Sequence, residues 1–293
     1  MISIIGGGIA GTYLALKLSD KGYVVHLYEK RSHLLNSNPY CHLHYGLLYP
    51  DISLEDCLKL AQDSEKFKEE FPNAIQKKQT IILNADGFNS NLLEKAKLLN
   101  NLYPDFAIIN NEYVIANEYQ IIQEKVEEEL LKRIEKSSIT VHLNTEIASQ
   151  KDGIWIDCTN TSDLMEQKTV FYFDFKLDYE IAVLNNRGYP GMVQITPLEH
   201  IVAVHVMDYK ATLSSVITNN TIEYVISRVS EIIPEFSTAK YFTHKTCLQQ
   251  LNNNVYNRLS TFTICNNVIK ICLMKAISII SIADNVAEYL DKK

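Results

Sequence analysis

The first eleven residues carry a glycine pattern that restricts the fold more than any other part of the sequence. An apolar, mostly β-branched run over residues 2–5 is followed by Gly6, Gly8 and Gly11 at G-x-G-x-x-G spacing. Such a run is typical of a buried parallel strand. The three glycines permit, in turn, a tight strand-to-helix turn, close approach of the backbone to a pyrophosphate, and close packing of helix on strand. The pattern therefore predicts a strand, a turn and a helix that together bind a dinucleotide.

The residues that follow complete a βαβ unit. Ala15 and Leu18 lie on one face of the predicted helix, which Gly22 ends. Residues 23–28 form the expected second strand. Glu29 then places a carboxylate at the tip of that strand, where it can accept hydrogen bonds from both hydroxyls of a ribose. Because a carboxylate there argues against a 2′-phosphate, the expected ligand is FAD or NAD.

Composition excludes several other classes of protein. Of the 293 residues, 46% are hydrophobic and 22% are charged, as in a globular chain and not in a disordered one. The excess of 35 Asp+Glu over 28 Lys+Arg argues against nucleic acid as a partner. The cysteines include no C-x-x-C pair, so we expect reduced thiols and no metal site. No apolar run is long enough for a membrane span, and the N-terminus indicates folded structure, not a signal peptide, so we expect a cytoplasmic protein.

In its first 31 residues the sequence resembles the ADP-binding motif of FAD-dependent oxidoreductases of the D-amino-acid oxidase and glycine oxidase type. That motif combines G-x-G-x-x-G with a small residue in the helix, a glycine before the second strand, and a closing acid followed by a basic residue. The resemblance implies that the cofactor is bound by Gly6, Gly8, Ile9, Ala10, Gly11, Glu29, Lys30 and Arg31. NAD enzymes share the glycines, so these residues alone leave FAD and NAD open.

The layout of the remaining chain favours FAD. NAD dehydrogenases continue with a regular alternation of strands and helices, whereas an irregular polar stretch covers residues 31–50 here. Short strands then accumulate, which indicates an antiparallel second domain. Helices are expected over 54–71, 91–102 and 116–136, and strands over 79–84, 107–116, 139–147, 153–158, 169–179, 191–196 and 201–209.

We therefore predict an α/β protein with a Rossmann-type FAD-binding domain and an interleaved, mainly antiparallel α+β substrate domain. The FAD-binding domain would comprise residues 1–75, 119–160 and 258–293, and the substrate domain residues 76–118 and 161–257. The resemblance implies an oxidoreductase that oxidises a C–N or C–O bond of a small, carboxylate-bearing substrate. A dinucleotide-binding module derived from such a flavoprotein, with weak or no turnover, and an NAD-dependent dehydrogenase are the alternatives. The sequence leaves the substrate, the electron acceptor and the oligomeric state open.

Candidate residues for the chemistry lie in the loop after Glu29, which this family threads along the cofactor. His44 and Tyr45 are candidate catalytic residues there, and His42 is a candidate for substrate binding. A histidine can exchange a proton near neutral pH or bind a carboxylate. Arg187 resembles the R-G turn of the family's substrate domain and could bind a carboxylate through two hydrogen bonds. A structural or solvated role is the alternative for each of these side chains.

Two later segments also match the family. Residues 139–147 are similar to the strand whose backbone touches the adenine, which implies cofactor contacts at Val141 and Glu146. The segment that begins at Ser278 matches the carboxy-terminal helix whose N-terminus faces the flavin, where the helix dipole stabilises an anionic reduced ring. Lys275, just upstream, would add a full positive charge, and we count it as a candidate catalytic residue.

Two departures from the family pattern concern the flavin end of the site. The family has small residues at the end of a strand near position 180, where they pass close to the cofactor, and this chain has Tyr179 and Glu180. The family also has glycines before the last helix, and residues 263–280 contain none. These positions motivate the alternative of a binding module without turnover.

Overall fold

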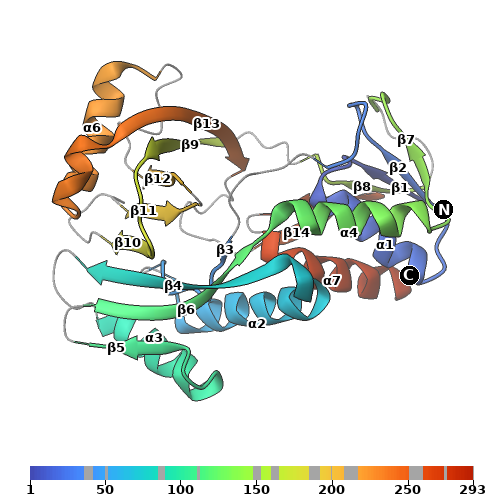
Figure 1. Ribbon diagram of the computed structural model, residues 1–293. Coiled ribbons are helices and arrows are strands. Elements are labelled where there is room, and N and C mark those ends of the chain that lie inside the picture. The colour runs from blue at the N-terminus through green and yellow to red at the C-terminus, as the bar shows by residue number, and fades with distance from the viewer. Residues whose placement is uncertain are drawn as a thin grey trace.

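The computed structural model describes residues 1–35, 42–49, 52–84, 90–110, 113–147, 153–159, 165–184, 192–198, 200–207, 217–250, 260–273 and 276–292. These residues form an α/β structure built on two β-sheets that lie side by side (Figure 1). The expected fold class is confirmed. The predicted domain limits remain a prediction.

The first sheet has six strands in the order β14-β15-β8-β1-β2-β7. Its central strand β1 pairs in parallel with both β2 and β8, so Ile4 lies between Leu27 and Ile156. Helices cover one face of this sheet (Figure 1). The elements are β1 (Ile2–Ile5), α1 (Ile9–Asp20), β2 (Val25–Tyr28), α4 (Gln123–Glu135), β7 (Thr140–His142), β8 (Ile154–Asp157), β14 (Thr261–Cys265), β15 (Val268–Cys272) and α7 (Ile279–Asp291).

The second sheet has nine strands, in the order β13-β9-β12-β11-β10-β4-β6-β3 with β5 paired to β6, and all its pairings except β4 with β10 are antiparallel. The elements are β3 (His42–Leu43), β4 (Ile75–Asn84), β5 (Ala107–Ile109), β6 (Tyr113–Ile121), β9 (Met165–Asp174), β10 (Glu180–Leu184), β11 (Met192–Pro197), β12 (Val202–Met207) and β13 (Lys240–Gln250).

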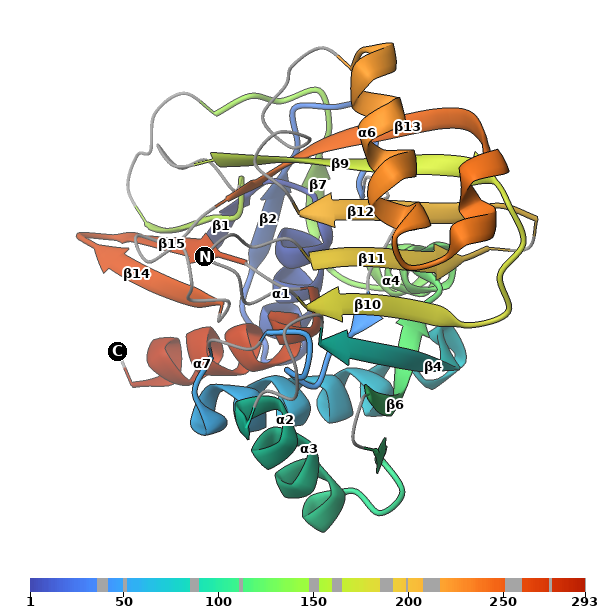
Figure 2. The ribbon, with the colours of Figure 1, turned by 90° about the vertical axis from the view of Figure 1, so that its left-hand side faces the viewer.

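Helices cover the second sheet from outside and below (Figure 2). Helix α6 (Asn219–Ser230) packs Val225 and Val229 against one face, in a core that includes Phe171 and Val204. Helices α2 (Leu54–Glu70) and α3 (Ser90–Leu102) pack beneath β4 and β6. The site described below lies on the face of the sheet opposite α6.

The helix predicted over residues 116–136 is wrong in its first part. Strand β6 continues to Ile121, and α4 begins only at Gln123. Burial alternates along β6, with Val114, Ala116 and Glu118 facing inward, and the strand pairs with β4 along most of its length. The tertiary pairing therefore overrides a local sequence that also fits a helix.

The sequence analysis expected the strand that passes close to the cofactor to end near position 180, and this expectation is also wrong. Strands β9 and β10 belong to the larger sheet, and β8 is the strand beside β1. The residues after β8 are small, and a Cβ at Gly6 would lie 2.9 Å from the carbonyl oxygen of Cys158. The small residues that pass the glycine turn are thus Cys158 and Thr159. Tyr179, which is 44% exposed, lies elsewhere.

No helix in the described part of the chain is long and apolar enough to cross a membrane. Four of the cysteines, Cys57, Cys158, Cys265 and Cys272, have free thiols.

Candidate active site

The glycine turn at the start of α1 shows which of its glycines the fold itself needs. Gly6 has a φ of +99°, a backbone conformation that residues with a side chain rarely adopt. A Cβ at Gly11 would lie 1.9 Å from the carbonyl oxygen of Gly6. A Cβ at Gly8, in contrast, would meet nothing within 4 Å. The space above Gly8 is therefore open where the motif predicts a pyrophosphate.

Glu29 lies beside this turn with its side chain 4% exposed. The N–H of Gly7 donates a 2.7 Å hydrogen bond to Oε2 of Glu29, and the backbone N–H and Nε of Arg31 each donate a 2.9 Å bond to Oε1. Burial opposes ionisation, but the hydrogen bonds from Arg31 and Gly7 lower the pKa of Glu29 to about 2. The carboxylate is thus charged at neutral pH.

Backbone hydrogen bonds join the end of β2 to the segment that follows β7. The N–H of Glu29 donates to the carbonyl of His142, and the N–H of Thr145 donates to the carbonyl of Glu29, both over 2.9 Å. The N–H of Asn144 donates to the carbonyl of Arg31, also over 2.9 Å. The structure therefore brings the predicted cofactor residues of both strands to one edge of the sheet. Among them Val141 is half-buried, and Lys30 and Glu146 are exposed.

The start of α7 is the third predicted contact with the cofactor. Ser278 is its N-cap and is 2% exposed. Its hydroxyl oxygen makes no hydrogen bond to any part of the chain that the structure describes. A buried hydroxyl without a partner at a helix N-terminus is suited to a polar ligand atom. Lys275 and Arg187 lie outside the described residues.

The residues present therefore fit a dinucleotide cofactor. The open space at Gly8, with Ile9 and Ala10 in the first turn of α1, is suited to a pyrophosphate. The ionised Glu29 is suited to ribose hydroxyls, and the Ser278 hydroxyl to a polar group further along the cofactor.

The loop that contains His42, His44 and Tyr45 directs Tyr45 away from the two histidines. The ring of Tyr45 is 1% exposed and packs 4.6 Å from the ring of Phe106, and its hydroxyl donates to Glu65 of α2. The imidazoles of His42 and His44 stack on each other with centroids 4.9 Å apart. The structure thus brings the two histidines together, whereas the Tyr45 side chain packs between the loop and α2.

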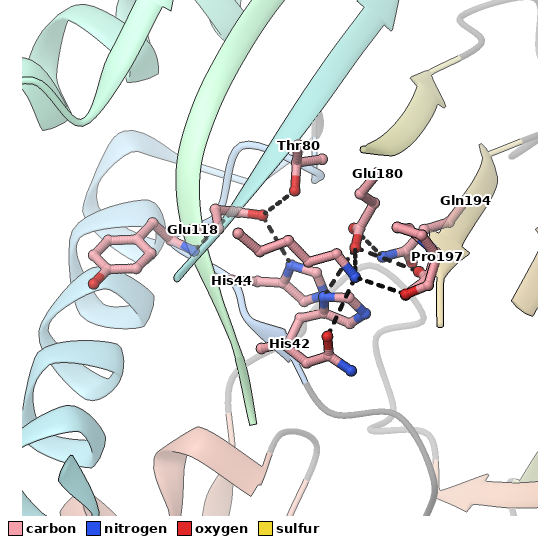
Figure 3. A network of polar contacts seen from close by, with 11 residues as sticks. His42, His44, Thr80, Glu118, Glu180, Gln194 and Pro197 are labelled. Carbon is pink, nitrogen blue, oxygen red and sulfur yellow. Dashed lines mark hydrogen bonds and ion pairs between the residues drawn. The ribbon is translucent and has the colours of Figure 1, made fainter. Parts of the chain in front are cut away.

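The two histidines face a buried polar cluster that the sequence analysis missed (Figure 3). Its side chains come from four neighbouring strands of the larger sheet and lie on the face opposite α6. The only signal in the sequence is that charged residues interrupt otherwise apolar strands. The cluster consists of Lys78, Thr80, Glu118, Glu180, Gln194 and Thr196.

Comparison with known proteins supports the architecture. Residues 4–41 match the family of NAD(P)-binding Rossmann-like domains, and comparison with curated proteins finds no match. L-Proline dehydrogenase from P. horikoshii superimposes with a TM-score of 0.71 at 13% identity, over 99% of this chain and 93% of that one. This is the fold of the D-amino-acid oxidase and glycine oxidase type.

Two further structures with this amino-acid oxidase fold extend the comparison. Glycine oxidase from Geobacillus kaustophilus has a TM-score of 0.64 at 11% identity, over 100% of this chain and 94% of that one. L-Amino acid deaminase from Proteus myxofaciens, in complex with anthranilate, has a TM-score of 0.67 at 10% identity, over 100% of this chain and 90% of that one. The resemblance recognised in the first 31 residues thus extends, as a fold, over the whole chain.

Within this amino-acid oxidase fold, one end of the polar cluster is ionised. Lys78 Nζ lies 3.3 Å from Oε2 of Glu180, and the Gln194 amide donates a 2.8 Å hydrogen bond to Oε1. Burial opposes the charge, but the positive charge of Lys78 and the hydrogen bond from Gln194 hold the pKa of Glu180 below its ordinary value. Burial also lowers the pKa of His42 to about 4, and Glu180 offsets only part of that effect. His42 is therefore neutral beside an ionised carboxylate.

The other end of the cluster is protonated. Glu118 is 1% exposed, and it accepts hydrogen bonds of 3.4 Å from the Tyr45 N–H and the Thr80 hydroxyl. Its Oε2 lies 3.6 Å from Nδ1 of His44. Burial, together with the charge of Glu180, raises the pKa of Glu118 to about 8. The site therefore holds two buried carboxyl groups in opposite protonation states at neutral pH.

Proposed function

We propose that this protein is an FAD-dependent oxidoreductase that oxidises a C–N bond of a small amino acid. The observation that carries the proposal is the buried, ionised Glu29 on the glycine turn, within a fold shared over the whole chain with L-proline dehydrogenase and glycine oxidase. When bound, FAD supplies the redox chemistry. The residues of the chain bind and orient the two ligands.

The ADP half of the cofactor would be bound at the edge of the six-stranded sheet. The open backbone at Gly8 and the N-terminus of α1 would approach the pyrophosphate. Glu29 would accept hydrogen bonds from the ribose, and the N-terminus of α7 at Ser278 would lie toward the flavin. Lys275 remains a candidate for a positive charge near the same position.

The substrate would bind against the polar face of the nine-stranded sheet. This face places His42 and His44 over ionisable groups that are almost completely excluded from water. Such a surface is suited to a small zwitterion, because each charge of the ligand needs a polar partner in a buried site. Arg187 remains a candidate for binding the carboxylate of the substrate.

The alternative of a binding module without turnover loses one of its two motivations. Glu180 is the first residue of β10 and Tyr179 precedes it, so both large residues lie away from the glycine turn. The residues next to the turn are Cys158 and Thr159, which are small. The absence of glycines before α7 remains. An NAD-dependent dehydrogenase is the less favoured alternative. It contains no flavin, so it would leave the contact that we expect at the N-terminus of α7 without a ligand.

The direct test is to titrate the nucleotide-free protein with FAD, FMN and NAD while following flavin fluorescence and absorption. We expect FAD alone to bind tightly. The holoprotein is then mixed anaerobically with glycine, N-methylglycine and L-proline, and bleaching of the flavin band reports oxidation. If FAD binds but no amino acid bleaches it, the result would support the alternative of a binding module without turnover. Tight binding of NAD but not of FAD would overturn the proposal. Glu128→Gln, at an acid of α4 whose side chain is 64% exposed, is the matched control for Glu29→Gln.

A further inference from the structure

The carboxylate of Glu29, at which we expect the ribose of the cofactor, accepts a full set of hydrogen bonds from the chain itself. Its Oε1 accepts 2.9 Å bonds from the backbone N–H and from Nε of Arg31. Its Oε2 accepts a 2.7 Å bond from the Gly7 N–H and a 3.3 Å bond from Nη2 of Arg31. An ionised carboxylate accepts about four hydrogen bonds. The four donors therefore fill it, and a ribose can bind to Glu29 only if a donor leaves.

We propose that the guanidinium of Arg31 and the ribose of the cofactor compete for Glu29, and that the two vicinal hydroxyls of the ribose displace the guanidinium. The inference rests on the proposed function and deepens it, because it names the contact that the cofactor must break and the part of the cofactor that breaks it. Arg31 then determines the selectivity of the site as a competitor of the ribose.

Of the donors to Glu29, only the side chain of Arg31 can leave without disturbing the backbone. The carbonyl of Gly7 accepts a 2.7 Å hydrogen bond from the Leu35 N–H, and the carbonyl of Arg31 accepts a 2.9 Å bond from the Asn144 N–H. These bonds fix the two backbone donors. The Arg31 side chain is 32% exposed, and within the described part of the chain its guanidinium bonds only to Glu29. It can therefore rotate into water at the cost of these bonds alone.

The two bonds that break are matched by a ribose. Nε of Arg31 donates to one oxygen of Glu29 and Nη2 to the other, so the planar guanidinium presents two neighbouring donors. The 2′- and 3′-hydroxyls of a ribose are also two neighbouring donors, and one ribose can replace both bonds. A 2′-deoxyribose replaces only one and leaves an acceptor of a carboxylate that is 4% exposed without a donor. The competition therefore selects a nucleotide with both hydroxyls.

The displacement is measured directly in nucleotide-free protein labelled with ¹⁵N-arginine, by following the Nε–H signals at pH 7. The chain has five arginines, and Arg31→Met identifies the signal of Arg31. Arg133 and Arg228, which pair with Glu70 and Glu231, are internal controls. We expect ADP to shift only the Arg31 signal of these three and to expose its hydrogen to exchange with water. An unchanged Arg31 signal with ADP bound, as established by calorimetry, overturns the proposal.

Affinities test the competition independently. Arg31→Met keeps the aliphatic part of the side chain and removes both donors, and Lys30→Met, at the exposed basic neighbour, controls for the lost positive charge. We expect Arg31→Met to bind FAD and ADP about fivefold more tightly than Lys30→Met does. Weaker binding by Arg31→Met would show that Arg31 is a ligand of the cofactor, which overturns the proposal.

The selection of both hydroxyls is tested with 2′-deoxy-ADP. Wild-type protein should bind it about tenfold more weakly than ADP. Equal affinities for the two nucleotides would contradict the selection.

Failure of the inference and failure of the proposed function give different results, because ADP is common to FAD and NAD. If ADP displaces Arg31 but FAD does not bind, the inference stands and the flavoprotein proposal falls. If FAD binds while Arg31 stays on Glu29, the inference falls and the flavoprotein proposal stands. If neither ADP nor FAD binds, both fall. Should Arg31→Met not fold, Arg31→Lys identifies the signal, and the wild-type spectrum decides.

Discussion

The backbone N–H of Gly7 donates a 2.7 Å hydrogen bond to the carboxylate of Glu29, and this contact joins the glycine turn to the end of β2. A Cβ at position 7 would lie 2.5 Å from Cδ2 of Leu34 and 3.0 Å from the Cβ of Glu29. The fourth glycine of the turn, which the motif does not specify, therefore leaves room for the side chains of Leu34 and Glu29. Glu29 stabilises the turn as well as being suited to a ribose.

Replacing Glu29 with Gln should lower both stability and FAD affinity. The loss of charge-assisted hydrogen bonds is expected to cost about 1.5–3 kcal/mol of unfolding free energy at pH 7. The pKa of Glu29 is depressed from 4.5 to about 2, so its stabilisation is complete above pH 4.5 and is lost as pH falls toward 2. Urea unfolding at pH 7, 4 and 3 should show the difference between wild type and Glu29→Gln shrinking. A difference that stays constant with pH would mean that the charge does not matter.

Gly8→Ala and Gly11→Ala should separate binding from folding. A methyl group at Gly8 meets nothing within 4 Å, so the melting temperature should stay within a degree or two while FAD affinity falls at least tenfold. A methyl group at Gly11 collides with the Gly6 carbonyl, which should destabilise the fold by about 1–3 kcal/mol. Thermal unfolding and FAD titration measure both effects. Full cofactor affinity in Gly8→Val, the larger replacement, would indicate that the turn is only structural.

Glu118→Gln should remove a pH dependence of stability. The pKa of Glu118 is raised from 4.5 to about 8, so its contribution is complete below pH 4.5 and is lost as pH rises toward 8. The pKa of His42 is lowered from 6.5 to about 4, and its opposite contribution varies only below pH 6.5. Between pH 6.5 and 8, wild-type stability should therefore fall with pH, by at most about 1.4 kcal/mol per pH unit. Urea unfolding should show a flatter profile in Glu118→Gln and an unchanged one in the exposed control Glu128→Gln.

Tyr45→Phe tests whether the hydroxyl of Tyr45 is structural or catalytic. The ring packing against Phe106 remains, and the hydroxyl loses its hydrogen bond to Glu65 and the one it accepts from Lys68, so we expect destabilisation of about 1–2 kcal/mol. FAD affinity and the rate of flavin reduction should change less than threefold. A collapse of the reduction rate at unchanged stability would assign the hydroxyl a catalytic role.

The sequence by itself determined the nucleotide-binding end of this protein. The glycine turn, the second strand and Glu29 follow one another within 29 residues, so their geometry depends on local backbone rules and adjacent pairing. The last helix could be placed for a similar reason, since its amphipathic pattern is local. Even the resemblance through which the fold was recognised rested on these short segments.

Only the tertiary structure decided the buried polar cluster on the nine-stranded sheet. His42 and Glu180 lie 138 positions apart in the sequence, and Lys78 and Glu118 come together only because β4 pairs with β6 in that register. The same pairing makes residues 116–121 a strand, and the pairing of β10 with β4 keeps Tyr179 away from the glycine turn. Neither the partners of a buried charge nor its protonation state can be read from local sequence, because both depend on burial and on which distant strands supply the neighbours.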